Sequence, residues 1–188
     1  YANERCHVYW LRHEYEHAIF WGEEGLKHVS ASDRGNWKAV AHTLALAKRD
    51  AGHIGEALAV FLDGNTLPSV LAGELTEKSE PGVIYGNVGR CLFLQNEVDD
   101  ALFCYVKSAE LLGVASLSNS HNCGYASTWI GEALEKKGDY LNAFLFYRLA
   151  HHQFLRFLPP LAEESLEKSD NLVSKSPILA NLGAVEEL

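Results

Sequence analysis

The stretch from Tyr85 to Leu112 contains two amphipathic patterns separated by a polar break. Its first half places Tyr85, Val88 and Leu92 at the i, i+3, i+7 spacing of one helix face, with Gly89 beside them. The break falls at residues 96–99, and the second half carries Ala101, Phe103, Tyr105 and Leu111. This pattern predicts a helical hairpin, in which the small residues Gly89 and Ala101 let the two backbones approach closely.

The same pattern of small and large residues recurs in three other parts of the chain. The alanine early in each expected second helix marks the recurrence, because Ala18, Ala57, Ala101 and Ala143 are separated by 39, 44 and 42 residues. A period between about 20 and 50 residues is typical of solenoids and repeat arrays. A single hairpin cannot bury its apolar face alone, so stacked neighbours supply the core. The sequence therefore predicts an all-α fold of stacked antiparallel hairpins.

The repeated unit resembles the tetratricopeptide repeat, whose pattern is a W-x2-L-G-x2-Y helix followed by an A-x3-F helix. Two units match this pattern well, the third loosely, and the first keeps Ala18 but has Gly22 in place of the large aromatic residue. The period departs from the usual 34 residues of the family, and the extra length resembles the longer-helix variants of kinesin light chains and bacterial peptide-sensing regulators. The matching residues are Leu44, Ala45, Gly52, Ala57 and Phe61; Tyr85, Val88, Gly89, Leu92, Ala101, Tyr105 and Ser108; and Ile130, Gly131, Leu134, Gly138, Ala143, Tyr147 and Ala150.

The resemblance implies one domain over residues 1–188, a right-handed superhelical solenoid of about four repeats with capping helices at the C-terminal end. The expected repeats cover residues 1–30, 36–66, 82–113 and 124–156, and the C-terminal helices cover 159–188. Residues 176–188 either cap the stack or begin a fifth repeat. The chain begins with Tyr1 and contains no methionine, so we expect either a fragment of a larger protein or a chain whose methionines are missing from the printed sequence.

Several local boundaries follow from the residues alone. We expect helices at residues 37–50, 125–137 and 161–173, because Gly and Pro pairs punctuate the chain beside them. The segment 63–82, which contains Pro68 and Pro81, is expected to extend the second helix or to form an irregular turn. The small and polar residues 113–123 are interpreted as a loop.

Composition restricts the possible partners. The formal charge of -9 argues against a nucleic-acid or anionic-membrane surface, since such surfaces need clustered Lys and Arg. No apolar run approaches the roughly 20 residues that span a bilayer. The four cysteines lack C-x-x-C spacing, so they favour buried free thiols in a reducing, cytoplasmic compartment, although a Cys91–Cys104 bridge is conceivable.

One motif suggests an enzyme. Residues His13 to His17, HEYEH, match the H-E-x-x-H signature of zinc hydrolases, in which two histidines one helical turn apart bind the metal. Aligning HEYEHA with GDYLNA at residues 138–143 instead places His13 in the turn between two helices. The sequence therefore predicts neither a catalytic residue nor a metal ligand here.

Other candidate sites also have simpler explanations. His151 and His152 are adjacent and point to different helix faces, while His42 and His53 lie in different helices without a convincing third ligand. The glycines at 82, 86 and 89 lack the Lys-Ser/Thr ending of a phosphate loop. We therefore expect no cofactor and no enzymatic activity.

In the resembled family, the first helix of each hairpin lines a concave groove that binds an extended or helical peptide. Arg90 and Phe93 form the best candidate pair, since Arg and aromatic residues are enriched at binding hot spots. The paired lysines of the chaperone-binding members are missing, so their carboxylate clamp is not expected. The candidate groove residues are His7, Trp10, His42, Leu46, Arg49, Asn87, Arg90, Phe93, Thr128, Glu132 and Glu135.

Three hypotheses about function follow. The leading one is a non-enzymatic scaffold or recognition module that binds a protein or peptide in this groove. The second is a ligand- or peptide-sensing domain of a multidomain regulator, whose repeats change curvature when the ligand binds. The third is a zinc hydrolase built on the HEYEH motif. The sequence does not indicate the oligomeric state.

Overall fold

A computed structural model describes residues 1–30, 32–75, 81–113 and 121–186, with side chains through Asn181. The described backbone is α-helical and contains no strand, which confirms the predicted all-α class. None of the helices in these ranges is both long enough and apolar enough to cross a membrane. The residues cluster into two compact units, Tyr1–Thr76 and Glu77–Leu188. A single stack running through both units stays a prediction.

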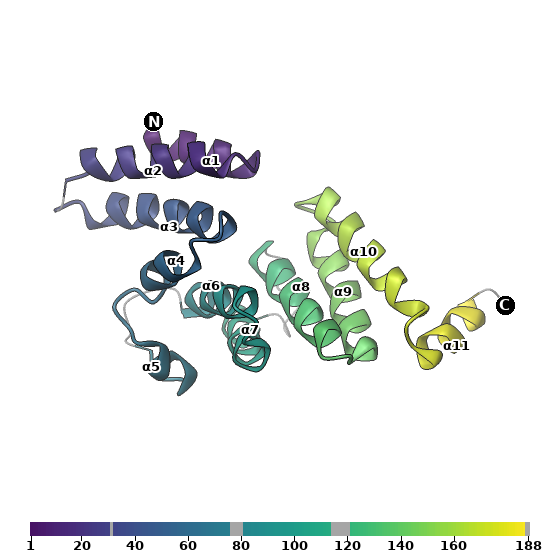
Figure 1. Ribbon diagram of the computed structural model, residues 1–188. Coiled ribbons are helices and arrows are strands. Elements are labelled where there is room, and N and C mark those ends of the chain that lie inside the picture. Colours follow the sequence, from purple (N-terminus) through teal and green to yellow (C-terminus); the bar gives the residue numbers. More distant parts are fainter. Residues whose placement is uncertain (31, 76–80, 114–120, 187–188) are drawn as a thin grey trace. The chain divides into compact units, whose positions relative to one another are not determined.

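The first unit contains two helical hairpins and a short fifth helix (Figure 1). Its helices are α1 (Ala2–Leu11), α2 (Tyr15–His28), α3 (Arg34–Asp50), α4 (Ile54–Phe61) and α5 (Leu67–Leu71). Helix α1 packs on α2, α3 packs on both of them, and α4 packs on α3. The buried residues Cys6, Ala18 and Ala47 form a core between α1, α2 and α3, covered by Tyr9, Trp10, Ile19 and Trp21.

The second unit continues the same arrangement. Its helices are α6 (Pro81–Leu94), α7 (Val98–Leu112), α8 (His121–Lys136), α9 (Tyr140–Phe154), α10 (Pro159–Val173) and α11 (Pro177–Glu186). Helices α6 and α7 form one hairpin, α8 and α9 form the next, and α8 packs on α7 while α10 packs on α9 (Figure 1). Helix α11 contacts α10, and Leu172 and Leu179 join the core around Tyr147.

Four turns that join a first helix to a second helix share one geometry. The left-handed residue of each turn is His13, Gly52, Asn96 or Gly138, with φ of 59°, 94°, 70° and 81°. In each turn this residue donates its N–H to the carbonyl three residues earlier, and the next residue donates to the carbonyl five residues earlier. This pair of bonds is the Schellman motif, which satisfies the last carbonyls of a helix. The prediction that His13 lies in a turn is confirmed.

The alanines that marked the recurrence occupy equivalent places in the structure. Ala18, Ala57, Ala101 and Ala143 each lie five residues after the left-handed residue and are 0% exposed. Close packing explains the glycines in the first helices of the second unit. A Cβ on Gly89 would lie 2.9 Å from the Tyr105 ring, and one on Gly131 would lie 2.7 Å from the Tyr147 ring. These contacts support the predicted register of the hairpins.

Three local predictions need correction. Segment 63–82 contains the separate helix α5, because Thr66 and Ser69 form a reciprocal capping box and Pro68 occupies its first turn. Helix α8 begins at His121, so the last three residues of the expected loop are helical, while residues 114–120 lie outside the described ranges. Helix α3 begins at Arg34, where the Asp33 side chain accepts the Asn36 N–H.

The four cysteines are buried free thiols, so Cys91 and Cys104 are not bridged. Burial raises the pKa of the Cys6 thiol to about 11 and that of Cys104 to about 12. Both side chains are therefore protonated at neutral pH and act as small apolar groups in the core.

Candidate partner-binding surface

The predicted groove residues occupy recurring positions on the first helices of the hairpins. Two sets of four lie at fixed distances before the recurring alanine of each hairpin. One set lies eleven residues before it and consists of His7, Leu46, Arg90 and Glu132. The other lies eight residues before it and consists of Trp10, Arg49, Phe93 and Glu135. The shared register places each set at the same position on α1, α3, α6 and α8. Neighbouring members of a set can therefore meet only where two successive first helices approach each other.

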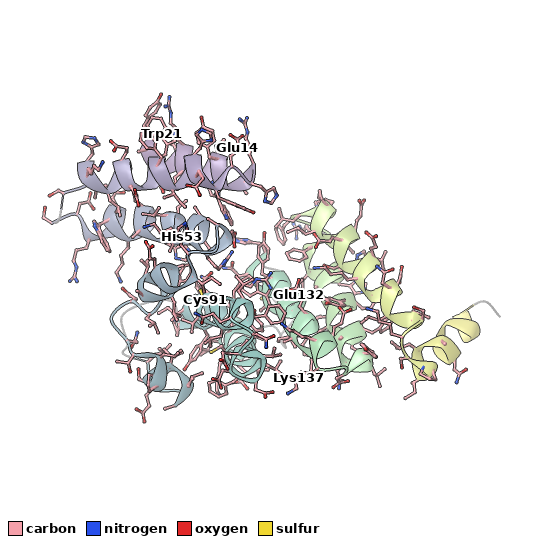
Figure 2. The ribbon with its side chains drawn as sticks, in the orientation of Figure 1. Glu14, Trp21, His53, Cys91, Glu132 and Lys137 are labelled. Atoms are coloured by element: carbon pink, nitrogen blue, oxygen red, sulfur yellow. The ribbon has the colours of Figure 1, made fainter. Side chains whose placement is uncertain are left out.

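In the second unit the register brings opposite charges together. Arg90 Nη1 on α6 donates to Glu132 Oε2 on α8 at 2.5 Å. Lys168 Nζ on α10 donates to Glu132 Oε1 at 2.9 Å and pairs with Glu164 at 3.0 Å. Glu132, labelled in Figure 2, therefore joins three helices through its two carboxylate oxygens. The three side chains are 20–28% exposed, so solvent reaches this cluster.

Phe93 lies next to this cluster, and two cationic side chains lie close to its ring. The Arg90 guanidinium lies 5.4 Å from the ring centroid, and Lys136 Nζ on α8 lies 4.9 Å from it. Both distances are within the range of cation–π attraction. Phe93 is half-buried, so part of its ring is accessible from solvent. Arg90, Phe93 and Lys136 thus form one amphipathic patch across α6 and α8.

Glu135 forms a second link on the same side of α8. Its Oε1 accepts from Lys175 Nζ at 2.8 Å, and its Oε2 accepts from the Tyr147 hydroxyl at 2.9 Å. Burial disfavours the Glu135 carboxylate, but the bonds from Lys175 and Tyr147 outweigh burial, so its pKa is lowered. Burial and the bond to Glu135 raise the pKa of Tyr147. Glu135 is therefore ionised at neutral pH and engaged by two groups.

The first unit uses an acidic residue in a comparable way. Trp10 Nε1 on α1 donates to Asp50 Oδ2 on α3 at 2.8 Å, and Arg49 Nε donates to Asp50 Oδ1 at 2.7 Å. His7 is exposed, and its ring lies 5.6 Å from that of Trp10. Two predicted residues, Trp10 and Arg49, therefore meet at Asp50.

The remaining predicted residues differ in accessibility. His42 and Leu46 are half-buried, and the His42 ring meets the Phe61 ring edge-on. Thr128 is half-buried and donates to the Gly124 carbonyl of its own helix.

Two of the eleven predicted residues, Arg49 and Asn87, are 7% and 6% exposed, so they offer little surface to a partner. Asn87 donates to the Val83 carbonyl of its own helix. Its neighbour Gly86 lies where Trp129 of α8 covers α6. The prediction that Asn87 lines an accessible groove is therefore not supported by its burial.

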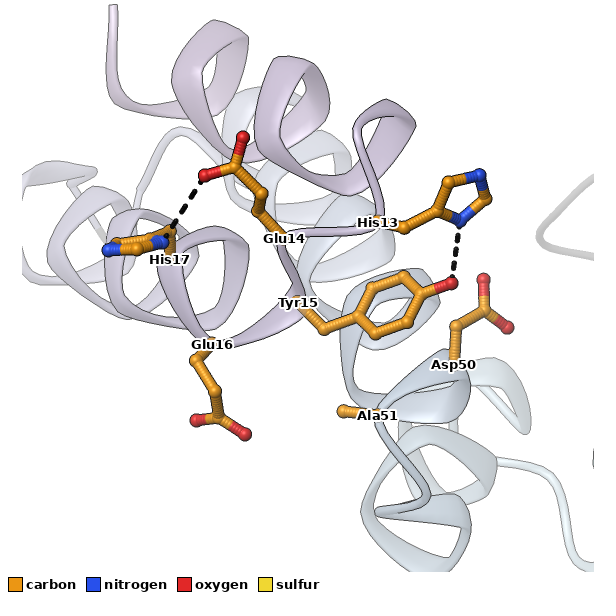
Figure 3. Close-up of a pocket in the computed structure, with 7 residues that line it drawn as sticks. All are labelled: His13, Glu14, Tyr15, Glu16, His17, Asp50 and Ala51. Carbon is orange, nitrogen blue, oxygen red and sulfur yellow. Dashed lines mark hydrogen bonds and ion pairs between the residues drawn. The ribbon is translucent and has the colours of Figure 1, made fainter.

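The HEYEH motif lines an open depression of about 470 Å³ in the first unit, together with Asp50 and Ala51 (Figure 3). His13 Nδ1 lies 2.8 Å from the Tyr15 hydroxyl, whereas His17 Nδ1 lies 3.5 Å from Glu14 Oε2. Figure 3 shows the two imidazoles well apart, with His13 beside Tyr15 and His17 beside Glu14.

The position of His13 explains why its imidazole and that of His17 diverge. A chelate from H-E-x-x-H needs both histidines on one helical face, but His13 precedes α2 with a left-handed backbone. In the part of the chain that the structure describes, no three His, Cys, Asp or Glu side chains are grouped to hold a metal ion.

The sequence pattern does not predict four residues of these surfaces: Asp50, Lys136, Lys168 and Lys175. Lys136 and Asp50 each follow a predicted residue by one position, on helices whose register was known. A search for opposite charges at adjacent register positions would have suggested them. Lys168 lies on α10, where the repeat pattern is lost, so only the packing of α10 reveals it.

Comparison of the sequence with models of known protein families, and with proteins of described function, finds no match.

Proposed function

We propose that this chain is a non-enzymatic helical-repeat module, similar to the tetratricopeptide type, that binds a protein or peptide through the first helices of its hairpins. The proposal includes a right-handed superhelix of about four repeats. It also includes a reducing compartment such as the cytoplasm, which the four free, buried cysteines support.

The observation that carries the proposal is the common geometry of the four hairpins. Each has the same Schellman turn, followed at a constant distance by an alanine that is 0% exposed. Repeated hairpins place equivalent residues of successive first helices along one line, and repeat proteins use such extended surfaces for binding. The exposed residues on these helices are therefore natural candidates for contacts with a partner.

The patch of Arg90, Phe93 and Lys136 is the best-supported contact point. It combines a half-buried aromatic ring with two cations, and aromatic residues and Arg dominate the energetics of many interfaces. The neighbouring carboxylates of Glu132 and Glu135 give the surface both signs of charge. Such a surface favours a peptide with an apolar anchor flanked by charged residues.

The test is selection of peptides from a random displayed library with the purified full chain, followed by affinity measurements on variants. Phe93→Ala removes the apolar centre of the patch, and we expect it to weaken the selected peptides. Leu145→Ala is the matched control, because Leu145 is 54% exposed on the second helix α9. Equal affinities for both variants and the unchanged chain would show that the first helices do not form the binding surface.

A further inference from the structure

Glu132 connects helices α6, α8 and α10. These three helices pack mainly against α7 and α9 rather than against one another. The principal packing in the second unit runs from α6 to α7, from α7 to α8, from α8 to α9 and from α9 to α10. Helices α6, α8 and α10 pack on one another much less, and side-chain bonds connect them. Arg90, Glu132 and Lys168 supply one continuous chain of charge-assisted hydrogen bonds from α6 through α8 to α10.

The surroundings make this connection stronger than an exposed ion pair. The three side chains are 24%, 20% and 28% exposed, so water and salt screen them less than fully exposed charges. Both oxygens of Glu132 are engaged, one by each cation. Without the carboxylate, Lys168 would still pair with Glu164 of its own helix, but the bonds that connect α6 to α10 through α8 would be lost.

We propose that Arg90, Glu132 and Lys168 form a charge strap that holds the hairpins on either side of Glu132 in a single arrangement. Loss or screening of the charge at Glu132 releases α6 and α10 together, although α6 precedes the α8/α9 hairpin in the chain and α10 follows it. The strap is a conformational device of the second unit, and it does not depend on the proposed partner binding. It crosses the same helix surface, so a partner bound there would sense whether the strap is closed.

Other ion pairs near the strap each connect only two segments of the second unit. Lys137, which follows α8, pairs with Asp99 of α7, and Arg148 of α9 lies 3.7 Å from Asp170 of α10. Lys175, which follows α10, pairs with Glu135 of α8. Each of these pairs connects one hairpin to the next. Glu132 differs from them because it contacts cations from both sides.

Hydrogen exchange of individual amides in the full chain tests the strap through Glu132→Gln. This change keeps the shape of the side chain and removes its charge. We expect exchange in α6 and α10 to accelerate by about two- to tenfold, in line with coupling energies of adjacent charged groups. Amides in the middle of α9 should keep their rates. Glu163→Gln is the control, since it removes an exposed carboxylate of α10 that makes no ion pair with the described residues.

A second arm uses the unchanged chain and remains informative if Glu132→Gln does not fold. Raising the salt concentration from about 0.05 to 0.5 M shortens the screening length. Amide exchange in α6 and α10 should therefore accelerate, while the exchange rates in α9 stay constant. Where Glu132→Gln folds, salt should accelerate its α6 and α10 much less. The proposal is overturned if neither change alters the exchange rates in α6 and α10, or if the rates change in only one of these two helices. It is also overturned if exchange in α9 accelerates by the same factor.

Discussion

At the scale of single residues, a glycine and a tyrosine sixteen positions later determine how closely the two helices of each hairpin pack in the second unit. Gly89 faces Tyr105 and Gly131 faces Tyr147, with no space for a Cβ. Both tyrosines are almost completely buried, at 0% and 1% exposed. The pair therefore explains in physical terms why a glycine recurs in the first helix and an aromatic residue in the second.

Gly131→Ala tests this close packing. The added Cβ would lie 2.7 Å from the Tyr147 ring, whose hydroxyl is bonded to Glu135 and cannot move freely. We expect a loss of about 1–3 kcal/mol in the free energy of unfolding, the usual cost of overpacking, measured by urea denaturation. Gly55→Ala is a useful control because nothing lies within 4 Å of its added Cβ. A Gly131→Ala variant as stable as the unchanged chain would contradict the packing described.

The link through Glu135 depends on pH. The folded pKa of Glu135 is lowered from its ordinary value of 4.5, so its ionised form stabilises the folded state above that pH. We expect the stability advantage of the unchanged chain over Glu135→Gln to be constant above about pH 4.5 and to shrink as the pH falls through the folded pKa. Urea denaturation of both proteins between about pH 2.5 and 7 measures this difference. An advantage that grows on acidification would have the wrong sign.

Sequence alone predicts the sites in part. The position of Arg90 and Phe93 follows from the repeat register, because residues of one register position lie on the same side of successive helices. Asn87 is only 6% exposed, and the adjacent Gly86 lies against Trp129 of the next hairpin. That contact depends on the rotation and distance between hairpins, which local periodicity does not encode.

At the scale of helices and turns, sequence predicts where the turns between paired helices fall, but not their Schellman geometry. Two of them use glycine, and the others use His13 and Asn96 at the same left-handed position. Helix α5 was missed because five residues are too few to show a periodic stripe. Its signal was present all the same, as the Thr66 to Ser69 capping box with Pro68 inside it.

The turn between α3 and α4 provides a matched pair of substitutions. Gly52→Ala forces a side chain into a residue with φ of 94°, and we expect it to destabilise the chain by about 1 kcal/mol. Gly55→Ala, three residues later in the first turn of α4, adds helix propensity without a clash and should have a neutral or stabilising effect of up to about 1 kcal/mol. Thermal unfolding of the two variants distinguishes these effects. Equal shifts of the two melting temperatures would contradict the turn geometry.

At the scale of the whole molecule, the all-α class and the succession of hairpins follow from the sequence, whereas the division into two compact units does not. The division falls between α5 and α6, where the repeat interval reaches its longest value of 44 residues. Periodicity finds hairpins because each has its own apolar stripe. The extent of one cooperative unit depends on contacts between hairpins, which no local pattern records.

The central claim is that the first helices form a surface for a peptide partner. The affinity of a library-selected peptide for the unchanged chain, for Phe93→Ala and for Leu145→Ala tests it most directly, with circular dichroism to verify that each variant is folded. We expect a loss of about tenfold or more for Phe93→Ala, the effect of removing an interface hot spot, and a change of less than about twofold for Leu145→Ala. The reverse order of effects, or no loss in either folded variant, would contradict the claim.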